Sequence, residues 1–228
     1  MRRARRRPQG RHRPDARTGA ERRVSQLLIV VSAPSGAGKT SLVRALVERD
    51  SNLEVSVSYT TRPRRPAEVD GRDYRFVSQA TFNGMARAGD LLEYATNFGF
   101  DYGTSQARVR EAQAAGRDVV LEIDWQGAQQ VRAQLDDAIG VFVLPPSREA
   151  LRARLEGRGQ DGPDVIERRM RQAIDDMTHC AEFDYAIVND DFEDAVAALA
   201  RIVTAERRGE RAPVPAIAGL LAELLATR

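Results

Sequence analysis

An apolar run at residues 27–32 is followed by a loop of small residues, APSGAG, and then by Lys39 and Thr40. A continuous, β-branched run of this length is typical of a strand that is buried on both faces of a parallel sheet. The apolar residues after Thr40 recur with helical spacing, at Leu42, Val43, Leu46 and Val47. A buried strand, a glycine-bearing loop and a helix in this order predict an α/β fold built around the loop.

The rest of the chain continues this alternation of strands and helices. Further buried strands are expected at 119–123, 141–144 and 186–188, and helices at about 105–115, 127–135, 147–157, 163–180 and 192–207. The pattern predicts a three-layer fold of the P-loop NTPase type with a mainly parallel sheet. Residues 53–103 break the alternation, and we interpret them as a small β-rich insertion in the α/β core.

The two ends of the chain differ from its centre. Residues 1–23 hold ten arginines and no apolar face, so we expect a disordered basic tail that could at most contact nucleic acid. A second interpretation is that translation starts at Val24. A proline-rich link and a short amphipathic helix are expected at 208–228.

Composition limits the cellular setting. No apolar run approaches the roughly 18 residues that span a bilayer, so no membrane partner is expected. The single cysteine, Cys180, excludes an intramolecular disulfide and fits a reducing compartment, so we expect a cytoplasmic protein. The oligomeric state stays open.

The loop itself predicts a site for phosphate. Residues 33–40, APSGAGKT, match the Walker A spacing except that Ala33 replaces the first glycine. Glycines let backbone N–H groups turn toward phosphate oxygens, and a helix N-terminus adds partial positive charge. Lys39 is the only lysine among 35 basic residues, which indicates that this position needs a compact ammonium. The predicted triphosphate-binding residues are Ala33, Pro34, Ser35, Gly36, Ala37, Gly38, Lys39 and Thr40, with the Thr40 hydroxyl as a ligand of Mg²⁺.

Seven segments together resemble the guanylate kinase family. They are SAPSGAGKTSL (32–42), VSVSYTTRPRRPAEVDGRDYRFV (55–77), LLEYATNFGFDYGTS (91–105), LEIDWQGAQQV (121–131), VLPPS (143–147), LEGRGQD (155–161) and IVNDD (187–191). The resemblance implies direct in-line transfer of the γ-phosphate of MgATP to GMP, and also to dGMP, without a phosphoenzyme. It implies a kinase-like domain at 24–207, with a GMP-binding part at about 57–105 and a helical lid at about 147–172.

The resemblance also implies which residues grip the acceptor phosphate. They are Arg62, Arg65, Tyr74 and Tyr102. A phosphate dianion suits fork-shaped cations and hydroxyls, which agrees with these residue types. Arg64 stands where the family commonly has proline, so Arg64 and Arg65 compete for the role of the second arginine.

The guanine base is expected to be read by one carboxylate. Glu93 matches the family's guanine-reading glutamate, because a carboxylate accepts from both N1–H and the 2-amino group. Ser58 and Thr104 match its hydroxyl contacts to the base. Glu122 and Asp124 share one face of a strand and suit either the water shell of Mg²⁺ or the base and ribose of the acceptor.

Three arginines match the family's contacts to ATP and to the transition state. They are Arg154, Arg158 and Arg169, of which the first two are four residues apart on one helix face. Asn189 matches a residue near the adenine of ATP. Transfer of a phosphoryl group needs mainly positioning and charge stabilisation, so mobile arginines beside the phosphate loop fit this chemistry.

Two other functions would fit part of this sequence pattern. A non-catalytic binding module of the same fold would typically have a damaged phosphate loop, whereas Lys39 and Thr40 are intact. A kinase for a ribose bisphosphate would have no reason to keep Ser58, Glu93 and Thr104 together.

Overall fold

The computed structural model describes residues 26–157, 162–213 and 215–226. The expected basic tail, the alternative start at Val24 and the lid residue Arg158 lie outside the described residues. Within the described ranges, no helix combines the length and the apolar character needed to cross a membrane.

The main sheet has five parallel strands in the order β2-β7-β1-β8-β9. The strands are β1 (Leu28–Ser32), β2 (Leu53–Val55), β7 (Asp118–Glu122), β8 (Ile139–Leu144) and β9 (Tyr185–Val188). The strand β1 pairs with β7 on one side and with β8 on the other, so the loop that follows β1 leaves from the middle of the sheet. The predicted α/β fold with a mainly parallel sheet is confirmed.

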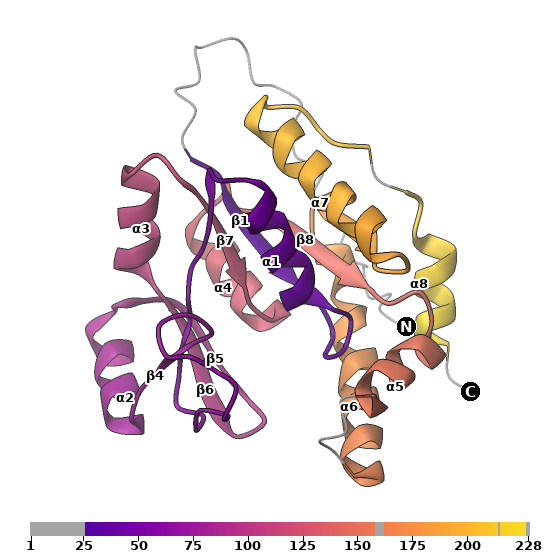
Figure 1. Ribbon diagram of the computed structural model, residues 1–228, viewed down its shortest axis with the longest axis horizontal. Helices are drawn as coiled ribbons and strands as arrows, with labels where there is room; N and C mark the ends of the chain where they lie inside the picture. The colour runs from indigo at the N-terminus through magenta and orange to yellow at the C-terminus, as the bar shows by residue number, and fades with distance from the viewer. Residues whose placement is uncertain (1–25, 158–161, 214, 227–228) are drawn as a thin grey trace, which may run out of the picture.

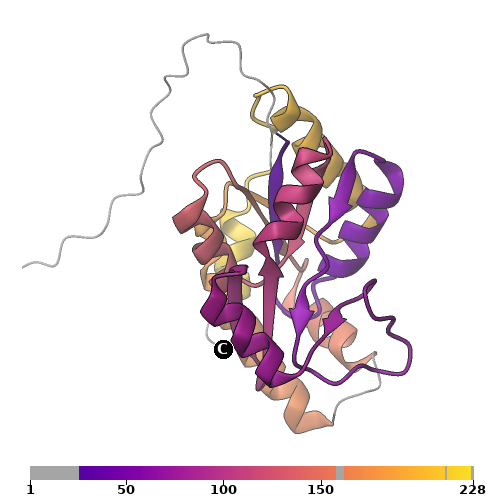
Figure 2. The ribbon, with the colours of Figure 1, turned by 90° about the vertical axis from the view of Figure 1, so that its left-hand side faces the viewer.

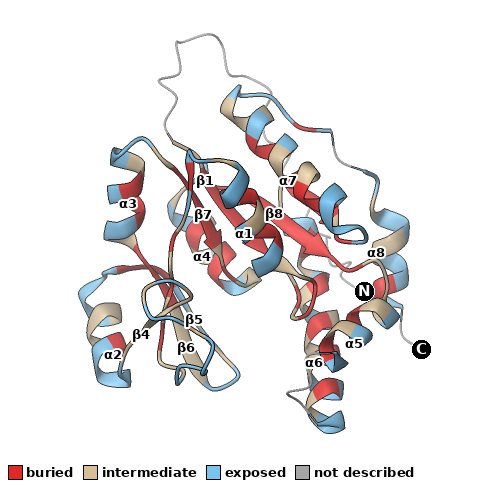
Figure 3. Cartoon of the chain, in the orientation of Figure 1, coloured by how far each residue is buried: buried red, intermediate tan, exposed pale blue. Residues whose placement is uncertain are grey.

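Helices cover both faces of this sheet (Figures 1 and 2). Side chains such as Ile29 and Val31 pack toward α1 (Lys39–Arg49) and α7 (Phe192–Arg207). Their neighbours Leu28 and Val30 face the opposite layer, which holds α3 (Gln106–Ala114) and α4 (Trp125–Gln134). Both faces of the strands are therefore apolar, as Figure 3 shows by the burial of the central sheet.

The helices begin where the sequence provides caps. Among the described helices, five follow a residue whose side chain accepts a backbone N–H of the first turn: Ser78, Ser105, Asp124, Ser147 and Asp191. These caps fix where each helix leaves the edge of the sheet.

A second, smaller sheet lies beside the main one, with strands in the order β4-β3-β6-β5. They are β3 (Tyr59–Thr60), β4 (Arg75–Phe76), β5 (Leu91–Asn97) and β6 (Phe100–Ser105). Two features differ from the expected β-rich insertion at 53–103. Residues 53–55 form β2 and pair with β7 of the main sheet, because Leu53 is fully buried against it, and residues 79–88 form helix α2 (Gln79–Ala88).

The remaining helices lie at the other end of the main sheet. They are α5 (Arg148–Glu156), α6 (Pro163–Thr178), the 3₁₀ turn η1 (Cys180–Glu182) and α8 (Ala218–Leu225). Leu151 and Leu155 of α5 pack on Ile166 and Met170 of α6, and α8 packs against β8 and the edge strand β9. The C-terminal helix expected within 208–228 is thus the short α8.

One arginine joins the end of α7 to the main sheet. Arg207 contacts Asp50 at 2.6 Å and Asp118 at 2.7 Å, and Asp118 also accepts from the backbone N–H of Leu27 at 2.7 Å. Asp118 is 7% exposed, so its charge depends on these partners. The cluster ties the start of β1 and the start of β7 to the last turn of α7.

Replacing this arginine should therefore destabilise the fold. Because Arg207→Ala leaves two acidic groups without a cation, we expect it to lower the free energy of unfolding by about 2 kcal/mol. Arg201→Ala, on the exposed side of the same helix, should change it by no more than about 0.5 kcal/mol. Urea unfolding measures both, and equal effects of the two substitutions would contradict the role given to Arg207.

Candidate functional site

The loop between β1 and α1 has a backbone that glycine alone adopts easily. Gly36 and Gly38 both have φ of +93°, and Gly38 is the N-cap of α1. A Cβ at Gly38 would lie 2.3 Å from Asn189 Nδ2, and one at Gly36 would lie 3.0 Å from Leu151 Cδ1. Both the backbone angle and the packing therefore require glycine, and the turn opens at the positive end of a helix.

Asn189 holds this loop from the end of β9. Its side-chain Nδ2 donates to the carbonyl oxygen of Ala37 at 2.7 Å, and its backbone carbonyl oxygen accepts from the Arg154 guanidinium at 2.8 Å. Asn189 is 5% exposed. The resemblance places Asn189 near adenine, which stays a prediction; in the described structure its side chain supports the phosphate loop, and its backbone carbonyl accepts from Arg154.

Lys39 starts α1 and reaches across to the neighbouring strand. Its Nζ donates to the carbonyl oxygen of Ile123 at 3.1 Å. Burial lowers the pKa of Lys39, and four carboxylates oppose that shift: Glu122, Asp124, Glu93 and Asp176. Thr40, the next residue, is exposed at the first turn of the helix. A cation on Lys39 and a hydroxyl on Thr40 thus stand together at the mouth of the loop.

The predicted carboxylate of the acceptor site is deeply buried. Glu93 is 3% exposed and is the cross-strand partner of Thr104, whose Oγ1 donates to Glu93 Oε1 at 2.6 Å. Burial raises the pKa of Glu93 to about 7, and the charge of Asp124 raises it further, whereas the bond from Thr104 lowers it. Glu93 therefore carries a carboxyl group that changes protonation near neutral pH.

A glycine makes room for this carboxyl group. A Cβ at Gly127 would lie only 2.4 Å from Glu93 Oε2. Gly127 is in the first turn of α4, where its N–H donates to the capping side chain of Asp124 at 2.9 Å. The sequence analysis did not single out Gly127, although a glycine within a predicted helix signals a close approach.

The residues expected to grip a phosphate gather on the smaller sheet. The guanidinium of Arg62 lies 5.4 Å from the ring centre of Tyr74, which lies 5.8 Å from the ring centre of Tyr102. Ser58 is buried nearby at the start of β3. Burial raises the pKa of Tyr74 to about 12, so its hydroxyl stays protonated and can donate.

Glu68 orients this group and was missed by the sequence analysis. It binds the Arg62 guanidinium at 2.6 Å and accepts from the backbone N–H of Arg65 at 2.8 Å. The side chain of Arg64 donates to the carbonyl oxygen of Glu68 at 3.1 Å, whereas Arg65 is exposed. The hydrogen bond to Glu68 thus holds the Arg64 side chain within the turn. Arg65 is therefore the better placed of the two arginines to receive an anion.

Glu122 and Asp124 lie where β7 meets α4, but they do different things. Asp124 caps α4, and Glu122 is half-buried close to Lys39 and Tyr74. No group of three or more His, Cys, Asp or Glu side chains able to hold a metal ion occurs among the described residues.

The helix α6 contacts the smaller sheet. The guanidinium of Arg169 lies 5.5 Å from the ring centre of Phe98, and Gln172 Nε2 donates to Asn97 Oδ1 at 3.2 Å. Phe98 has a φ of 51° at the tip of the β5–β6 hairpin and is 44% exposed. This hairpin carries Glu93, so α6 touches the element that holds the acceptor carboxylate.

Trp125 links α4 to the end of α6 by packing. Its ring stacks on His179 with centres 3.5 Å apart, and it donates a hydrogen bond to Asp176. Burial raises the pKa of Asp176 to about 6 and that of Cys180 to about 11. The thiol of Cys180 is therefore protonated at neutral pH.

Comparisons with known proteins find relatives over most of the chain. Residues 25–206 match the family described as "Guanylate kinase". The chain is 54% identical over 198 residues to guanylate kinase of Alkalilimnicola ehrlichii, with 87% of this chain and 98% of that protein covered. It is 52% identical over 201 residues to guanylate kinase of Chromohalobacter salexigens, with 86% and 94% covered.

A solved structure is similar as well. The crystal structure of guanylate kinase from Anaplasma phagocytophilum superposes with a TM-score of 0.68 at 31% sequence identity. It covers 81% of this chain, and the match spans 88% of the solved chain.

The close approach at Gly127 gives a test of the site's packing. Gly127→Ala should destabilise the protein by about 1–3 kcal/mol, because the new methyl group meets the Glu93 carboxylate. Gly84→Ala is the matched control, since Gly84 is also helical and a Cβ there meets nothing within 4 Å. That control should stabilise by up to about 1 kcal/mol through helix propensity. Stabilisation of both variants in urea unfolding would contradict the proposed contact.

Proposed function

The chain belongs to the guanylate kinase family, and we propose that its site transfers the γ-phosphate of MgATP to GMP, giving ADP and GDP. The observation that carries the proposal is the buried pair of Glu93 and Thr104, which lies in the same site as the phosphate loop and Lys39. We extend the proposal to dGMP, because none of the contacts considered below requires the 2′-hydroxyl.

The base of the acceptor is read by Glu93. An ionised carboxylate accepts from both N1–H and the 2-amino group of guanine, whereas adenine presents an acceptor at N1. A buried group that is built for two donors rejects a base that lacks them by a large factor, because its lone pairs would stay unpaired. Thr104 fixes the orientation of the carboxylate, and Ser58 is placed to contact the base edge.

The phosphate of the acceptor is held by Arg62 and Arg65 with the hydroxyls of Tyr74 and Tyr102. Glu68 keeps the Arg62 fork against the tyrosine rings, so the cation is aimed before the acceptor binds. Glu122, beside Lys39, is placed between the acceptor and donor halves, and we assign it and Asp124 to the acceptor side.

On the donor side, the backbone of residues 33–40 surrounds the phosphates of ATP and Lys39 neutralises them. Mg²⁺ supplies further charge neutralisation when it is bound to ATP, and the Thr40 hydroxyl is the protein group that would hold it. Arg154 lies next to the loop through Asn189, and Arg169 lies on the face of α6 that meets the acceptor hairpin. We assign Arg154, Arg158 and Arg169 to the charge that develops on the transferred group.

The step itself is an in-line attack by an acceptor phosphate oxygen on the γ-phosphorus. The bond to the β–γ bridging oxygen breaks, and ADP leaves as the new P–O bond of GDP forms. The protein contributes positioning and charge stabilisation, so no phosphoenzyme is formed. Contact between α6 and the acceptor hairpin excludes water from the phosphates, which suppresses hydrolysis of ATP.

Neither alternative function is favoured. A non-catalytic module would not need the supported phosphate loop with Lys39, and a ribose bisphosphate would not use the buried Glu93. A cytoplasmic location stays a prediction, in keeping with the buried, protonated Cys180.

The acceptor specificity tests the function directly. ADP formation from MgATP should be fastest by a wide margin with GMP, followed by dGMP, and near background with AMP, CMP, UMP or a ribose bisphosphate. Lys39→Ala should lower the rate with GMP by about 100-fold or more while the unfolding transition stays cooperative, which excludes a contaminating kinase. A preference for any acceptor other than a guanine nucleotide would overturn the proposal.

The protonation of Glu93 predicts a pH dependence of GMP binding. Because the pKa of Glu93 is raised to about 7, lowering the pH through 7 protonates the carboxylate and places an O–H against the N1–H donor. The Kd for GMP should approach a rise of about tenfold per pH unit below that value. Titration calorimetry between pH 5.5 and 8.5 measures it.

Two variants separate the titration of Glu93 from that of other groups that affect GMP binding. Glu93→Gln should lower kcat/KM for GMP roughly 100-fold at pH 8 and remove the break near pH 7. The remaining slope belongs to the phosphate of GMP, whose second pKa is about 6. Glu48→Gln, an exposed position on α1, should keep the break. A break that persists in Glu93→Gln would assign it to another group.

A further inference from the structure

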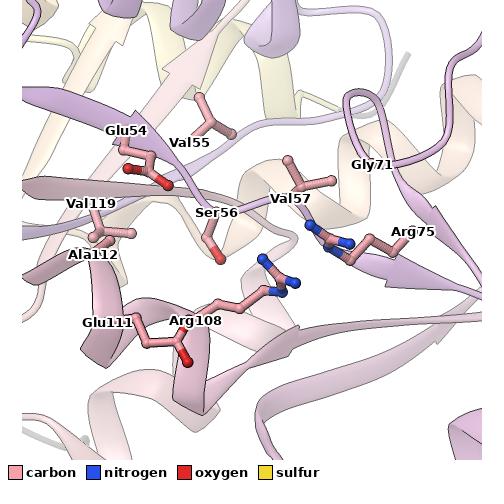
Figure 4. Close-up of a pocket in the computed structure, with 10 residues that line it drawn as sticks. All are labelled: Glu54, Val55, Ser56, Val57, Gly71, Arg75, Arg108, Glu111, Ala112 and Val119. Carbon is pink, nitrogen blue, oxygen red and sulfur yellow. The ribbon is translucent and has the colours of Figure 1, made fainter.

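A second cavity lies at the seam between the two sheets, away from the phosphate loop (Figure 4). Its volume is about 200 Å³, and it is lined by residues of β2, β4, α3 and the connection between β2 and β3. Besides the acidic residues Glu54 and Glu111, its lining has three polar groups, those of Ser56, Arg75 and Arg108. None of these three belongs to the site described above.

Two arginines converge in this cavity without an acidic partner. Figure 4 shows the guanidinium groups of Arg75 and Arg108 directed toward Ser56. No salt bridge joins either group to a carboxylate within the described ranges. Arg75 comes from the smaller sheet and Arg108 from α3, so the tertiary structure brings the two charges together.

The acidic residues that line the cavity do not neutralise this pair. Glu54 Oε2 lies 3.4 Å from Arg117 Nε, and Glu111 is exposed on α3 with its carboxylate turned away from the two guanidinium groups in Figure 4. Each guanidinium stays charged and offers several N–H donors to a ligand. The arrangement therefore favours a bound anion.

Ser56 provides a further donor at the same place. It is 9% exposed, and no hydrogen-bond partner of its hydroxyl oxygen occurs among the described residues; the same holds for the buried Nε of Arg75. An unpaired buried hydroxyl costs about 1–3 kcal/mol, so such groups usually have a partner. A hydroxyl and two planar forks are together the donor set that suits a tetrahedral oxyanion.

We propose that this cavity binds an oxyanion of the phosphate class, either inorganic phosphate or the phosphate group of a small phosphorylated metabolite. The volume of about 200 Å³ suits such a group and is small for a whole nucleotide. The proposal stands apart from the proposed phosphotransfer, because it uses none of the residues assigned to ATP or GMP.

The cavity and the acceptor site lie on opposite faces of β4. Side chains alternate along a strand, so Arg75 points away from the side taken by Tyr74 and Phe76, which contact Arg62. The two places are linked by backbone, since the N–H of Arg75 donates to the carbonyl oxygen of Ser58 at 2.9 Å. A bound anion would tie β4 to α3 and so hold the smaller sheet against the main one.

Binding of inorganic phosphate to the full chain tests the proposal. The catalytic phosphate positions are first filled with GMP and a non-hydrolysable ATP analogue, and ionic strength is held constant with chloride. Titration calorimetry should then detect one further phosphate site in the wild type. Ribose 5-phosphate in a parallel titration distinguishes the two sources: binding of either ligand supports the site, and the tighter one names the source.

Substitutions locate the site. Arg108→Gln and Arg75→Gln should each weaken phosphate binding at least about tenfold, which corresponds to about 1.4 kcal/mol. Arg110→Gln, an exposed position on the same helix that does not line the cavity, should leave it unchanged. Arg108 is itself exposed, so its substitution should keep the wild-type unfolding midpoint and the rate with GMP. Absence of a further site in the wild type, or equal affinity in all three variants, would overturn the proposal.

Discussion

The turn between β1 and α1 is the constraint on which the rest of the structure depends. Its glycines at 36 and 38 adopt positive φ, and the surrounding elements pack so closely that a Cβ at either position would collide with them. Asn189 reaches the turn from β9, and Lys39 reaches from it to the backbone that follows β7. Three strands and α5 are thus fixed relative to the place where phosphate binds.

The acceptor half depends on a different compromise. A carboxylate that accepts from two donors of a base must be shielded from water. The same desolvation raises the pKa of Glu93 into the range where the group loses its charge. Thr104 offsets part of this cost by donating to Glu93, and the missing side chain at Gly127 leaves room beside the N-terminus of α4. Discrimination between bases is therefore gained at the expense of activity in acid.

Local periodicity was sufficient to predict most of the fold, including the four buried strands around the loop and the helices α1 and α3–α7. Two elements could not be found that way. The three residues of β2 belong to the main sheet only through pairing with β7, about 65 residues further along the chain, and α2 lies within residues 53–103, whose turn-forming residues favoured a β-rich interpretation. Glu68 and the Gln172–Asn97 contact were missed for the same reason, since their roles depend on partners that sequence spacing alone does not reveal.

The contact between α6 and the β5–β6 hairpin gives the two halves a common framework. Arg169 lies over Phe98, and Gln172 donates to Asn97, while the same hairpin carries Glu93 and Tyr102. The group proposed to read the base and the cation proposed to stabilise the transferred phosphate are therefore carried by two elements that contact each other directly.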